Sequence, residues 1–274
     1  MYIRMIARAA LAEDIGGGDI TTEAVVLKGQ KAKALIIAKE PMVVAGIDVA
    51  REVFKTVDKR MSFRPMVKDG ERVKKGAGLV SISGNLRAIL AAERTALNFL
   101  QRLSGIATLT ADFVGRVKPF NTRILDTRKT TPCLRPLERL AVRAGKGFNH
   151  RFGLSQAILI KDNHIKAAGS VACALRRAKK RHPDSPIEVE VNTLKELEEA
   201  LNHGAGLIML DNMGVKDMRK AVAIIGGRAF VEASGRVTVD NIKEIAATGV
   251  DAISIGRLTH SARAMDISLE VISD

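Results

Sequence analysis

The sequence predicts an α/β protein whose larger, C-terminal part contains a parallel sheet. From Phe120 onward, short apolar segments alternate with charged segments that have helical spacing. The last four apolar segments begin about twenty residues apart, which is the length of one βα unit. Six such units without a GxGxxG fingerprint favour a complete or partial α/β barrel over a dinucleotide-binding fold.

Length and composition place the chain among ordinary globular proteins. Its 274 residues can bury a substantial core, and 46% are hydrophobic and 27% charged. No apolar run approaches the roughly 18 to 20 residues that a spanning helix needs, and the chain reaches Glu13 too soon for a signal peptide. We expect the two cysteines, Cys133 and Cys173, to be reduced thiols in a cytoplasmic protein.

The charge points to an anionic ligand. Lys and Arg number 44 against 30 Asp and Glu, which gives a net charge of +14. Such a balance suits nucleic acid, an anionic membrane surface or a highly anionic small molecule. Aromatic residues make up only 3%, with no Trp, so proteins that stack single-stranded bases on aromatic side chains are a poor match.

The N-terminal third is mixed in character. Its apolar spacing predicts four helices and two strands, separated by turn signals such as the segment 68–71. The predicted helices cover 3–13, 49–57, 89–103 and 106–117, and the predicted strands cover 34–38 and 79–82.

Polar residues follow each predicted strand of the C-terminal part. In an α/β barrel the ligand site lies at the carboxyl ends of the strands, so we expect these residues to surround one mouth. The predicted strands cover 123–127, 157–161, 187–191, 207–211, 230–233 and 252–256. The residues at their ends are Arg128, Lys129, Lys161, Asp162, Glu190, Asp211, Ser234, Gly235 and Gly256.

The segment 123–151 carries eight Lys or Arg residues against two carboxylates. Arg binds carboxylate and phosphate through a planar fork, whereas Lys acts as a point charge. Arg135, Arg139 and Arg143 are spaced by four residues, which we interpret as one solvated helix face. The cations outside that helix are the candidates for binding a multiply charged anion, namely Arg128, Lys129, His150 and Arg151.

The remaining strand ends suggest further chemistry. Glu190 and Asp211 could hold Mg²⁺, bind ribose hydroxyls, act as a general acid and base, or form structural ion pairs. Ser234, Gly235 and the stretch 256–260 are typical of a phosphate site late in a barrel, where backbone N–H groups and small side chains meet the phosphate.

The chain resembles the quinolinate phosphoribosyltransferase family over nearly its whole length. The resemblance rests on runs that occur in family order, none of which is a generic motif. They are EDIGGGDITTEAV (13–25), ERTALNFLQRLSGIAT (93–108), DTRKTTP (126–132), FNHRFGL (148–154), AILIKDNHI (157–165), EVEV (188–191), IMLDNM (208–213), EASG (232–235) and ISIGRLTHS (253–261).

The resemblance implies a fold, an assembly and a reaction. It implies an N-terminal α/β sandwich domain, which we assign to 1–108, followed by an incomplete parallel α/β barrel over 109–274. It implies a homodimer or larger homo-oligomer in which Arg94 reaches the partner's site. The implied reaction joins quinolinate to phosphoribosyl pyrophosphate with Mg²⁺, and it gives nicotinate mononucleotide, CO₂ and pyrophosphate for NAD biosynthesis.

The resemblance also implies roles for individual residues. Arg94, Arg128, His150 and Arg151 would bind the carboxylates of quinolinate, with Thr127 nearby. Lys161, Glu190 and Asp211 would be catalytic: Lys161 would lie between the two substrates, and the carboxylates would hold ribose hydroxyls near the Mg²⁺ that the donor carries, with no direct metal ligand assigned. The groups implied for the donor's phosphates are Lys129, Ser234, Gly235, Gly256 and His260.

The chain departs from the family pattern at three positions where the family has glycine. These are Cys133 after the TTP run, Lys146 within a glycine triplet, and Arg236 after the EASG run. Arg236 matters most, since it would crowd the phosphate loop or add a charge to it.

Three other interpretations remain open at this point. Lys161 could form a Schiff base in a barrel aldolase, although Arg94, Arg128 and Arg151 would then have no role. The cluster 176–181 could be a nucleic-acid patch, although we favour a solvated outer helix of the barrel. A metal-transport-associated relative with the same fold could use a different substrate, but the intact KDNH run (161–164) disfavours it.

Overall fold

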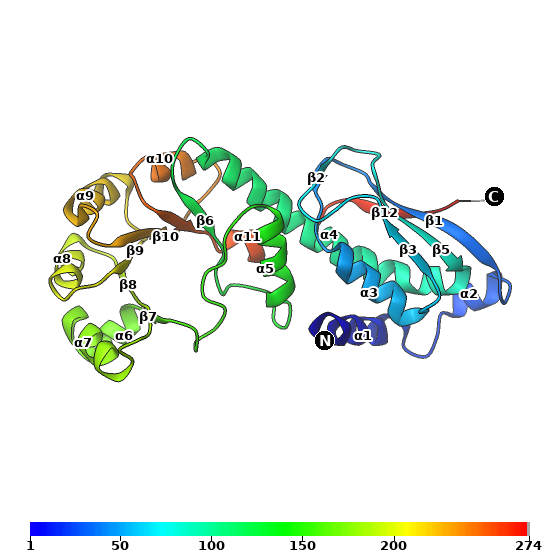
Figure 1. Cartoon of the computed structure of the whole chain (residues 1–274), viewed down its shortest axis with the longest axis horizontal. Coiled ribbons are helices and arrows are strands. Elements are labelled where there is room, and N and C mark those ends of the chain that lie inside the picture. Colours follow the sequence, from blue (N-terminus) through cyan, green and yellow to red (C-terminus); the bar gives the residue numbers. More distant parts are fainter. Residues whose placement is uncertain (273–274) are drawn as a thin grey trace. The chain divides into compact units, whose positions relative to one another are not determined.

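The computed structural model describes residues 1–272, which form two compact units. The antiparallel unit comprises 1–111, 132–146 and the C-terminal segment from Ser261. The parallel unit comprises 112–131 and 147–260. Figure 1 shows the elements of both units.

The antiparallel unit is a two-layer α/β sandwich. Its sheet has the strand order β12-β1-β5-β3, with every neighbouring pair antiparallel. Helices α1, α3 and α4 lie on one side of this sheet (Figure 1). Buried residues alternate along β1, where Ala34, Ile36 and Ala38 face the core. The strands are β1 (Lys31–Ala38), β3 (Ser62–Pro65), β5 (Gly78–Asn85) and β12 (Ile267–Ile272).

The helices of this unit present apolar faces to one shared core. Phe54 of α3 and Leu97 of α4 are among its fully buried members, which also include side chains from α1 and β5. The remaining elements are α1 (Tyr2–Ile15), α2 (Ile20–Val25), α3 (Ile47–Val57), α4 (Leu86–Val117), α5 (Arg135–Ala144) and the two-stranded sheet of β2 (Met42–Val43) and β4 (Arg72–Val73).

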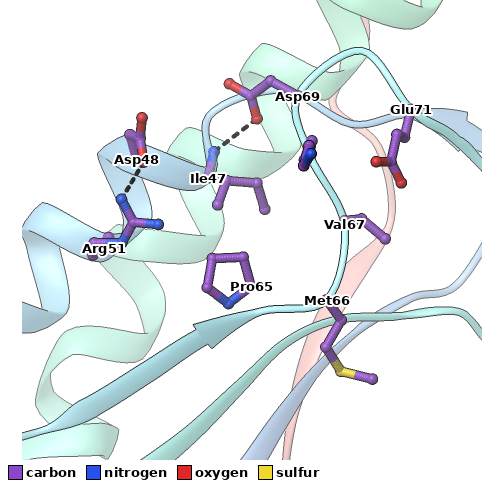
Figure 2. A pocket seen from close by; sticks show the side chains of 9 residues that line it. Ile47, Asp48, Arg51, Pro65, Met66, Val67, Asp69 and Glu71 are labelled. Carbon is purple, nitrogen blue, oxygen red and sulfur yellow. Dashed lines mark hydrogen bonds and ion pairs between the residues drawn. The ribbon is translucent and has the colours of Figure 1, made fainter.

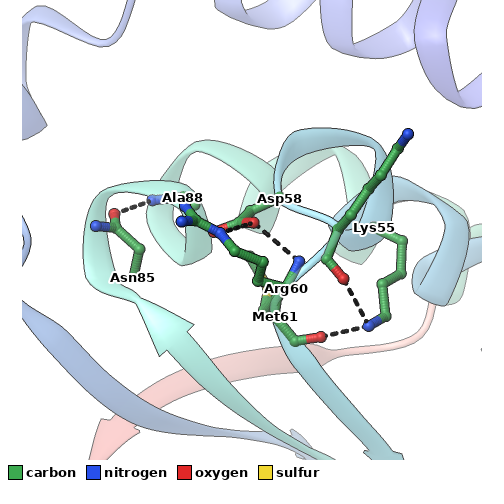
Figure 3. A network of polar contacts seen from close by, with 7 residues as sticks. Lys55, Asp58, Arg60, Met61, Asn85 and Ala88 are labelled. Carbon is green, nitrogen blue, oxygen red and sulfur yellow. Dashed lines mark hydrogen bonds and ion pairs between the residues drawn. The ribbon is translucent and has the colours of Figure 1, made fainter.

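Polar contacts fix both ends of helix α3. At the N-terminal end, the carboxylate of Asp69 accepts hydrogen bonds from the backbone N–H groups of Gly46 and Ile47, beside a pocket of about 440 Å³ (Figure 2). At the C-terminal end, the Lys55 ammonium donates to the carbonyls of Lys59 and Met61 (Figure 3). These contacts join the helix to the turns on either side of it.

Helix α4 differs from the sequence prediction. Two helices were expected over 89–103 and 106–117, but the structure has one continuous helix of 32 residues. The expected break at Gly105 is wrong because this glycine serves a close approach. A Cβ there would overlap the backbone carbonyl of Arg263. Glycine within a helix lowers stability by about 1 kcal/mol relative to Ala, but at this position only glycine allows the close tertiary contact.

The C-terminal strand belongs to the first unit. Strand β12 pairs with β1 in antiparallel register from Lys33↔Ile272 to Ala38↔Ile267. The last described residues of the chain therefore supply the edge strand of a sheet that the N-terminal part begins. The predicted domain division at residue 108 stays a prediction.

The parallel unit confirms the expected βα repetition. Its six strands are all parallel, in the order β6-β11-β10-β9-β8-β7. Phe148 extends the outer edge of β6 through hydrogen bonds with Ile124 and Asp126. Within the described residues, edge strands β6 and β7 do not pair with each other, as expected of an incomplete barrel. The strands are β6 (Arg123–Leu125), β7 (Ile158–Ile160), β8 (Ile187–Val191), β9 (Leu207–Asp211), β10 (Phe230–Ser234) and β11 (Ala252–Ser254).

Helices cover the outside of this sheet (Figure 1). Side-chain caps begin two of them: Ser170 accepts from the N–H of Cys173, and Thr193 accepts from that of Glu196. No helix in the described part of the chain is long and apolar enough to cross a membrane. The helices are α6 (Asp162–Ala168), α7 (Val171–Arg181), α8 (Leu194–Asn202), α9 (Val215–Ile225), α10 (Ile242–Ala246) and α11 (Arg257–His260).

Candidate functional site

A pocket of about 530 Å³ lies at the carboxyl ends of the parallel strands. This is the edge at which ligands bind in α/β barrels. The polar residues that the sequence singled out for this edge meet there in large part. Those that line the pocket are Thr127, Arg128, Lys129, His150, Arg151, Lys161, Glu190, Asp211, Ser234 and Gly235.

The cations of the pocket come from four segments of the chain, one of which carries Arg236 after β10. Arg128 and Lys129 follow β6, Arg151 follows the segment paired with β6, and Lys161 follows β7. Burial, and next the charge of Arg128, lower the pKa of the Arg151 guanidinium. Two mutually repelling guanidinium groups at one wall form a site that an anion stabilises on binding.

Lys161 and Glu190 form an ion pair inside the pocket. The Lys161 Nζ lies 2.8 Å from Oε2 of Glu190, whose side chain is 9% exposed whereas that of Lys161 is 45% exposed. The strand ends of β7 and β8 adjoin, which brings the two residues together. The lysine charge is therefore held in place but stays open to a ligand.

A second carboxylate and a tight loop lie at the ends of the next two strands, β9 and β10. Asp211, at the end of β9, accepts a hydrogen bond of 2.6 Å from the Asn212 side chain. The Asn212 backbone N–H donates to Ser234 at the end of β10. Gly235 has φ +90°, and a Cβ there would overlap the Asn212 side chain. Only glycine fits this loop without displacing Asn212.

Gly256 and His260 do not line the pocket themselves, but Gly256 lies next to both His260 and the pocket residue Lys129. A Cβ at Gly256 would lie 2.9 Å from Cδ of Lys129 and 3.2 Å from the His260 ring. The Thr259 hydroxyl donates to the backbone carbonyl of Lys129 at 2.6 Å. Two of the predicted phosphate residues, Gly256 and His260, thus lie close to the aliphatic part of the Lys129 side chain.

The three departures from the family's glycines share one backbone feature. Cys133, Lys146 and Arg236 all have left-handed backbone conformations, with φ of +60°, +67° and +51°. This is the region in which glycine carries no steric penalty. Arg236 also lines the pocket, so it adds a cation beside the Ser234 loop.

The sequence analysis missed two buried carboxylates next to His150, one of which, Glu232, lines the pocket. Glu188 of β8 and Glu232 of β10 are 8% and 2% exposed, and both contact the imidazole of His150. Alternation could have found them: each lies two residues before a pocket residue on its strand, and thus on the same face. Glu190 and Ser234 are those pocket residues.

A third missed carboxylate, Asp126, shapes the loop that carries His150. It is fully buried at the end of β6. It accepts a hydrogen bond of 2.5 Å from the Asn149 side chain and one of 2.7 Å from the backbone N–H of His150. Asp126 therefore ties the 149–151 turn to the sheet.

Arg94 lies elsewhere. It is an exposed residue of helix α4, in the part of that helix that belongs to the antiparallel unit. Its expected position in a partner's site stays a prediction.

Comparisons with known proteins show the family to which the chain belongs. Residues 19–104 match the family model for the N-terminal domain of quinolinate phosphoribosyl transferase, and residues 106–270 match the C-terminal domain model. The chain belongs to the quinolinate phosphoribosyltransferase family.

Relatives in this family match over nearly the full chain. A probable nicotinate-nucleotide pyrophosphorylase [carboxylating] of Bacillus subtilis is 42% identical, covering 99% of this chain and 94% of its own length. The enzyme of that name from Mycobacterium leprae is 43% identical over 96% of this chain and 95% of its own. The solved nicotinate-nucleotide pyrophosphorylase of Francisella tularensis has a TM-score of 0.95 and 42% identity, and the match covers 99% and 96% of the two chains.

One group in the described part of the chain has the spacing of metal ligands, namely His150, Glu188 and Glu232. The imidazole and the carboxylates already contact one another there, at 3.1 and 3.5 Å.

Proposed function

We propose that the protein transfers phosphoribosyl from phosphoribosyl pyrophosphate to quinolinate and releases CO₂, pyrophosphate and nicotinate mononucleotide, in the service of NAD biosynthesis. The observation that carries this proposal is the pocket of a family member, whose lining contains five Lys or Arg residues and three carboxylates. Both substrates are polyanions, and such a pocket neutralises both.

Quinolinate binds through its two carboxylates at the Arg128 and Arg151 wall. A guanidinium offers two parallel N–H donors to a carboxylate, which fixes the orientation of the pyridine ring as well as its position. Relief of the repulsion between the two guanidinium groups adds to the binding energy. His150 and Thr127 line the pocket on the same side of the sheet.

The donor occupies the part of the pocket at the ends of β9 and β10. Ser234, Gly235, Gly256 and His260 hold its 5′-phosphate, Lys129 binds a further phosphate, and the ribose hydroxyls meet Glu190 and Asp211. Carboxylate oxygens suit Mg²⁺, which the pyrophosphate carries into the region of these carboxylates. When bound, Mg²⁺ supplies charge neutralisation to the departing pyrophosphate.

The reaction needs no nucleophile from the protein. The bond from the anomeric carbon to pyrophosphate breaks as the pyridine nitrogen bonds to that carbon, and the carboxylates stabilise the positive charge on the ribose. The bond between the ring carbon next to the quaternised nitrogen and its carboxylate then breaks, CO₂ departs, and the electron pair stays on that carbon beside the positively charged nitrogen. Lys161 stabilises the resulting ring carbanion, which takes up a proton.

The competing interpretations fit less well. A Schiff-base lysine acts as a free amine, but Lys161 is ion-paired with Glu190. The basic residues of α7 lie on an exposed helix surface, which is the arrangement of a solvated face. Borohydride trapping with a carbonyl substrate and the salt dependence of DNA binding would test these alternatives.

We further propose a homodimer or larger homo-oligomer in the cytoplasm, with Arg94 completing the site of the partner subunit. Exposure of Arg94 on α4 supports a role for it outside its own subunit's core. The free thiols Cys133 and Cys173 fit a reducing compartment.

Parallel assays with quinolinate and nicotinate test the proposed function. Purified protein receives phosphoribosyl pyrophosphate and Mg²⁺ with one of the two acids, and mononucleotide formation is measured. We expect product from quinolinate only, because nicotinate lacks the second carboxylate. Product from nicotinate alone, or from neither acid, would contradict the proposal.

A further inference from the structure

Two buried carboxylates contact the ring of His150, and one of them, Glu232, also lines the pocket. Oε2 of Glu188 lies 3.1 Å from Nε2 of His150, and Oε2 of Glu232 lies 3.5 Å from the same atom. The two glutamates come from β8 and β10, which flank β9. The predicted substrate contacts give neither of them a role.

Both nitrogens of the His150 ring have partners within the protein. Nε2 points to the buried carboxylates, and Nδ1 accepts a hydrogen bond of 2.8 Å from the backbone N–H of Arg151. The ring therefore joins the carboxylates to the residue that carries the substrate-facing guanidinium. Arg151 Nη1 in turn donates to the carbonyl of Ala157 at 2.9 Å.

The surroundings of the ring act on its protonation in opposite directions. Burial would lower the pKa of His150, but hydrogen bonds to Glu188 and Glu232 and their charges outweigh it and raise the pKa to about 10. The N–H of Arg151 favours the ring that carries its only proton on Nε2. A second proton, on Nδ1, displaces that N–H but leaves the contact between Nε2 and the two glutamates in place. In either form Nε2 carries a proton and donates it toward the glutamates.

The other charged groups near the ring are the cations of the pocket. Arg128 and Arg151 lie on the same wall, Lys161 and Glu190 form their own pair, and Asp126 binds the His150 backbone. Glu188 also acts on Arg151, whose pKa its charge raises against burial and Arg128. The acidic pair thus offsets the positive charge of this wall before any anion arrives.

We propose that Glu188 and Glu232 are positioning residues, which hold the Nε2 proton of His150 in the interior and so fix the ring and the adjoining Arg151 for the dicarboxylate substrate. This inference rests on the proposed function for its substrate. It makes His150 the link between the buried carboxylates and Arg151, with its Nε2 held by Glu188 and Glu232.

The first test is the titration of the His150 ring by ¹⁵N NMR in histidine-labelled protein. The variants are Glu188→Gln and Glu232→Gln, which keep the side-chain shape and remove the charge, and the His150 signal is assigned by its loss in His150→Gln. In the wild type we expect no titration of this ring between pH 6 and 8.5. In each Gln variant we expect the midpoint to fall toward the ordinary value of about 6.5.

The second test is the pH dependence of kcat/KM for quinolinate. In the wild type we expect no change in kcat/KM that arises from titration of His150 up to about pH 9. Each Gln variant should have a higher KM for quinolinate, because the ring and Arg151 are held less firmly, with the KM for the donor unchanged. Glu138→Gln is the matched control: it removes a fully buried carboxylate, paired with Arg102 in the antiparallel unit, and should leave the profile unchanged.

The outcomes separate this inference from the proposed function. A His150 ring that titrates near 6.5 in the wild type, or that both Gln variants leave unaltered, would overturn the inference. If one variant does not fold, the other decides, because each glutamate contacts Nε2 directly. Absence of quinolinate turnover in the wild type would overturn the proposed function, while the NMR titration would still decide whether the glutamates hold the ring proton.

Discussion

At the scale of single residues, the candidate site depends on a few side chains whose charges oppose one another. The repulsion between Arg128 and Arg151 is relieved when a carboxylate binds, and the Lys161 charge is held by Glu190. These arrangements favour an anionic ligand over an empty pocket.

Substitution of Arg151 tests the carboxylate wall. We expect Arg151→Ala to lower kcat/KM for quinolinate at least about hundredfold, about 2.7 kcal/mol, because a charge-assisted contact is lost. Steady-state kinetics measure it, with circular dichroism to check the fold. Arg177→Ala, an exposed cation of α7, is the matched control and should keep wild-type kinetics. Equal kinetics for the two variants would contradict the assigned wall.

The left-handed residues give a stability prediction. We expect Lys146→Gly to raise the free energy of unfolding by about 1 kcal/mol, since a non-glycine residue at φ +67° is strained. Chemical denaturation measures the change. Lys166→Gly, within helix α6, is the control and should lower stability by about 1 kcal/mol. A loss of stability in Lys146→Gly would show that its side chain contributes more than its backbone costs.

Residue-level foresight was uneven for physical reasons. Cations at strand ends can be predicted from the sequence because a charged residue marks the point where an apolar run stops. Ten of the predicted residues line one pocket. The sequence analysis missed three buried carboxylates because a carboxylate within or just after a strand usually faces solvent. Only the folded structure shows that Asp126, Glu188 and Glu232 are buried.

At the scale of elements, close backbone approach decides where the chain can pass. Helix α4 continues through Gly105, where a side chain would overlap the carbonyl of Arg263. The sequence pattern predicted both halves of this helix. It could not show that the glycine between them serves a contact with a segment more than 150 residues away.

Two glycines of helix α4 form a matched pair for testing this. We expect Gly105→Ala to lower the free energy of unfolding by more than about 2 kcal/mol, because the new Cβ meets backbone that cannot move aside. Gly115→Ala in the same helix has open space and should raise stability by up to about 1 kcal/mol. Thermal or urea unfolding of both variants measures the difference. Similar effects at both positions would contradict the close approach.

The segment before β12 carries a pH-sensitive contact. Arg263 and the backbone N–H of Asp266 donate hydrogen bonds to Glu40 and lower its pKa from 4.5 to about 2. A lowered folded-state pKa contributes stability that is fully present above the unfolded value and is lost as the pH falls toward 2. Both side chains are partly exposed, so the contribution is at most about 1 kcal/mol.

Glu40→Gln measures that contribution. We expect the variant to be less stable than the wild type at pH 7 by up to about 1 kcal/mol, and the two to converge as the pH falls from 4.5 toward 2. Urea unfolding across this range gives the difference at each pH. A gap that is independent of pH would mean that shape, not charge, sets the role of Glu40.

At the scale of the whole molecule, the pattern of βα units predicted the parallel sheet. It did not predict that the C-terminal strand β12 belongs to the antiparallel sheet of the first unit. Strand β12 completes the antiparallel sheet alongside β1, so the first and last parts of the chain form one unit. Short antiparallel partners carry little local signal of what they pair with, because their pairing is set by residues far away in sequence.

Subunit mixing tests the predicted sharing of sites between subunits. Arg94→Ala and Lys161→Ala subunits should each be inactive alone. After unfolding and refolding as an equal mixture, half the dimers are mixed and each contains one intact site, so we expect about a quarter of wild-type activity. No recovery in a mixture that forms dimers would contradict a site shared through Arg94.

The central claim is that one pocket couples phosphoribosyl transfer to decarboxylation. The most direct measurement follows carboxyl-labelled quinolinate in a single turnover, with CO₂, pyrophosphate and mononucleotide determined together. We predict equal amounts of the three products and no CO₂ when phosphoribosyl pyrophosphate is left out. Release of CO₂ without the donor, or pyrophosphate without CO₂, would contradict this account.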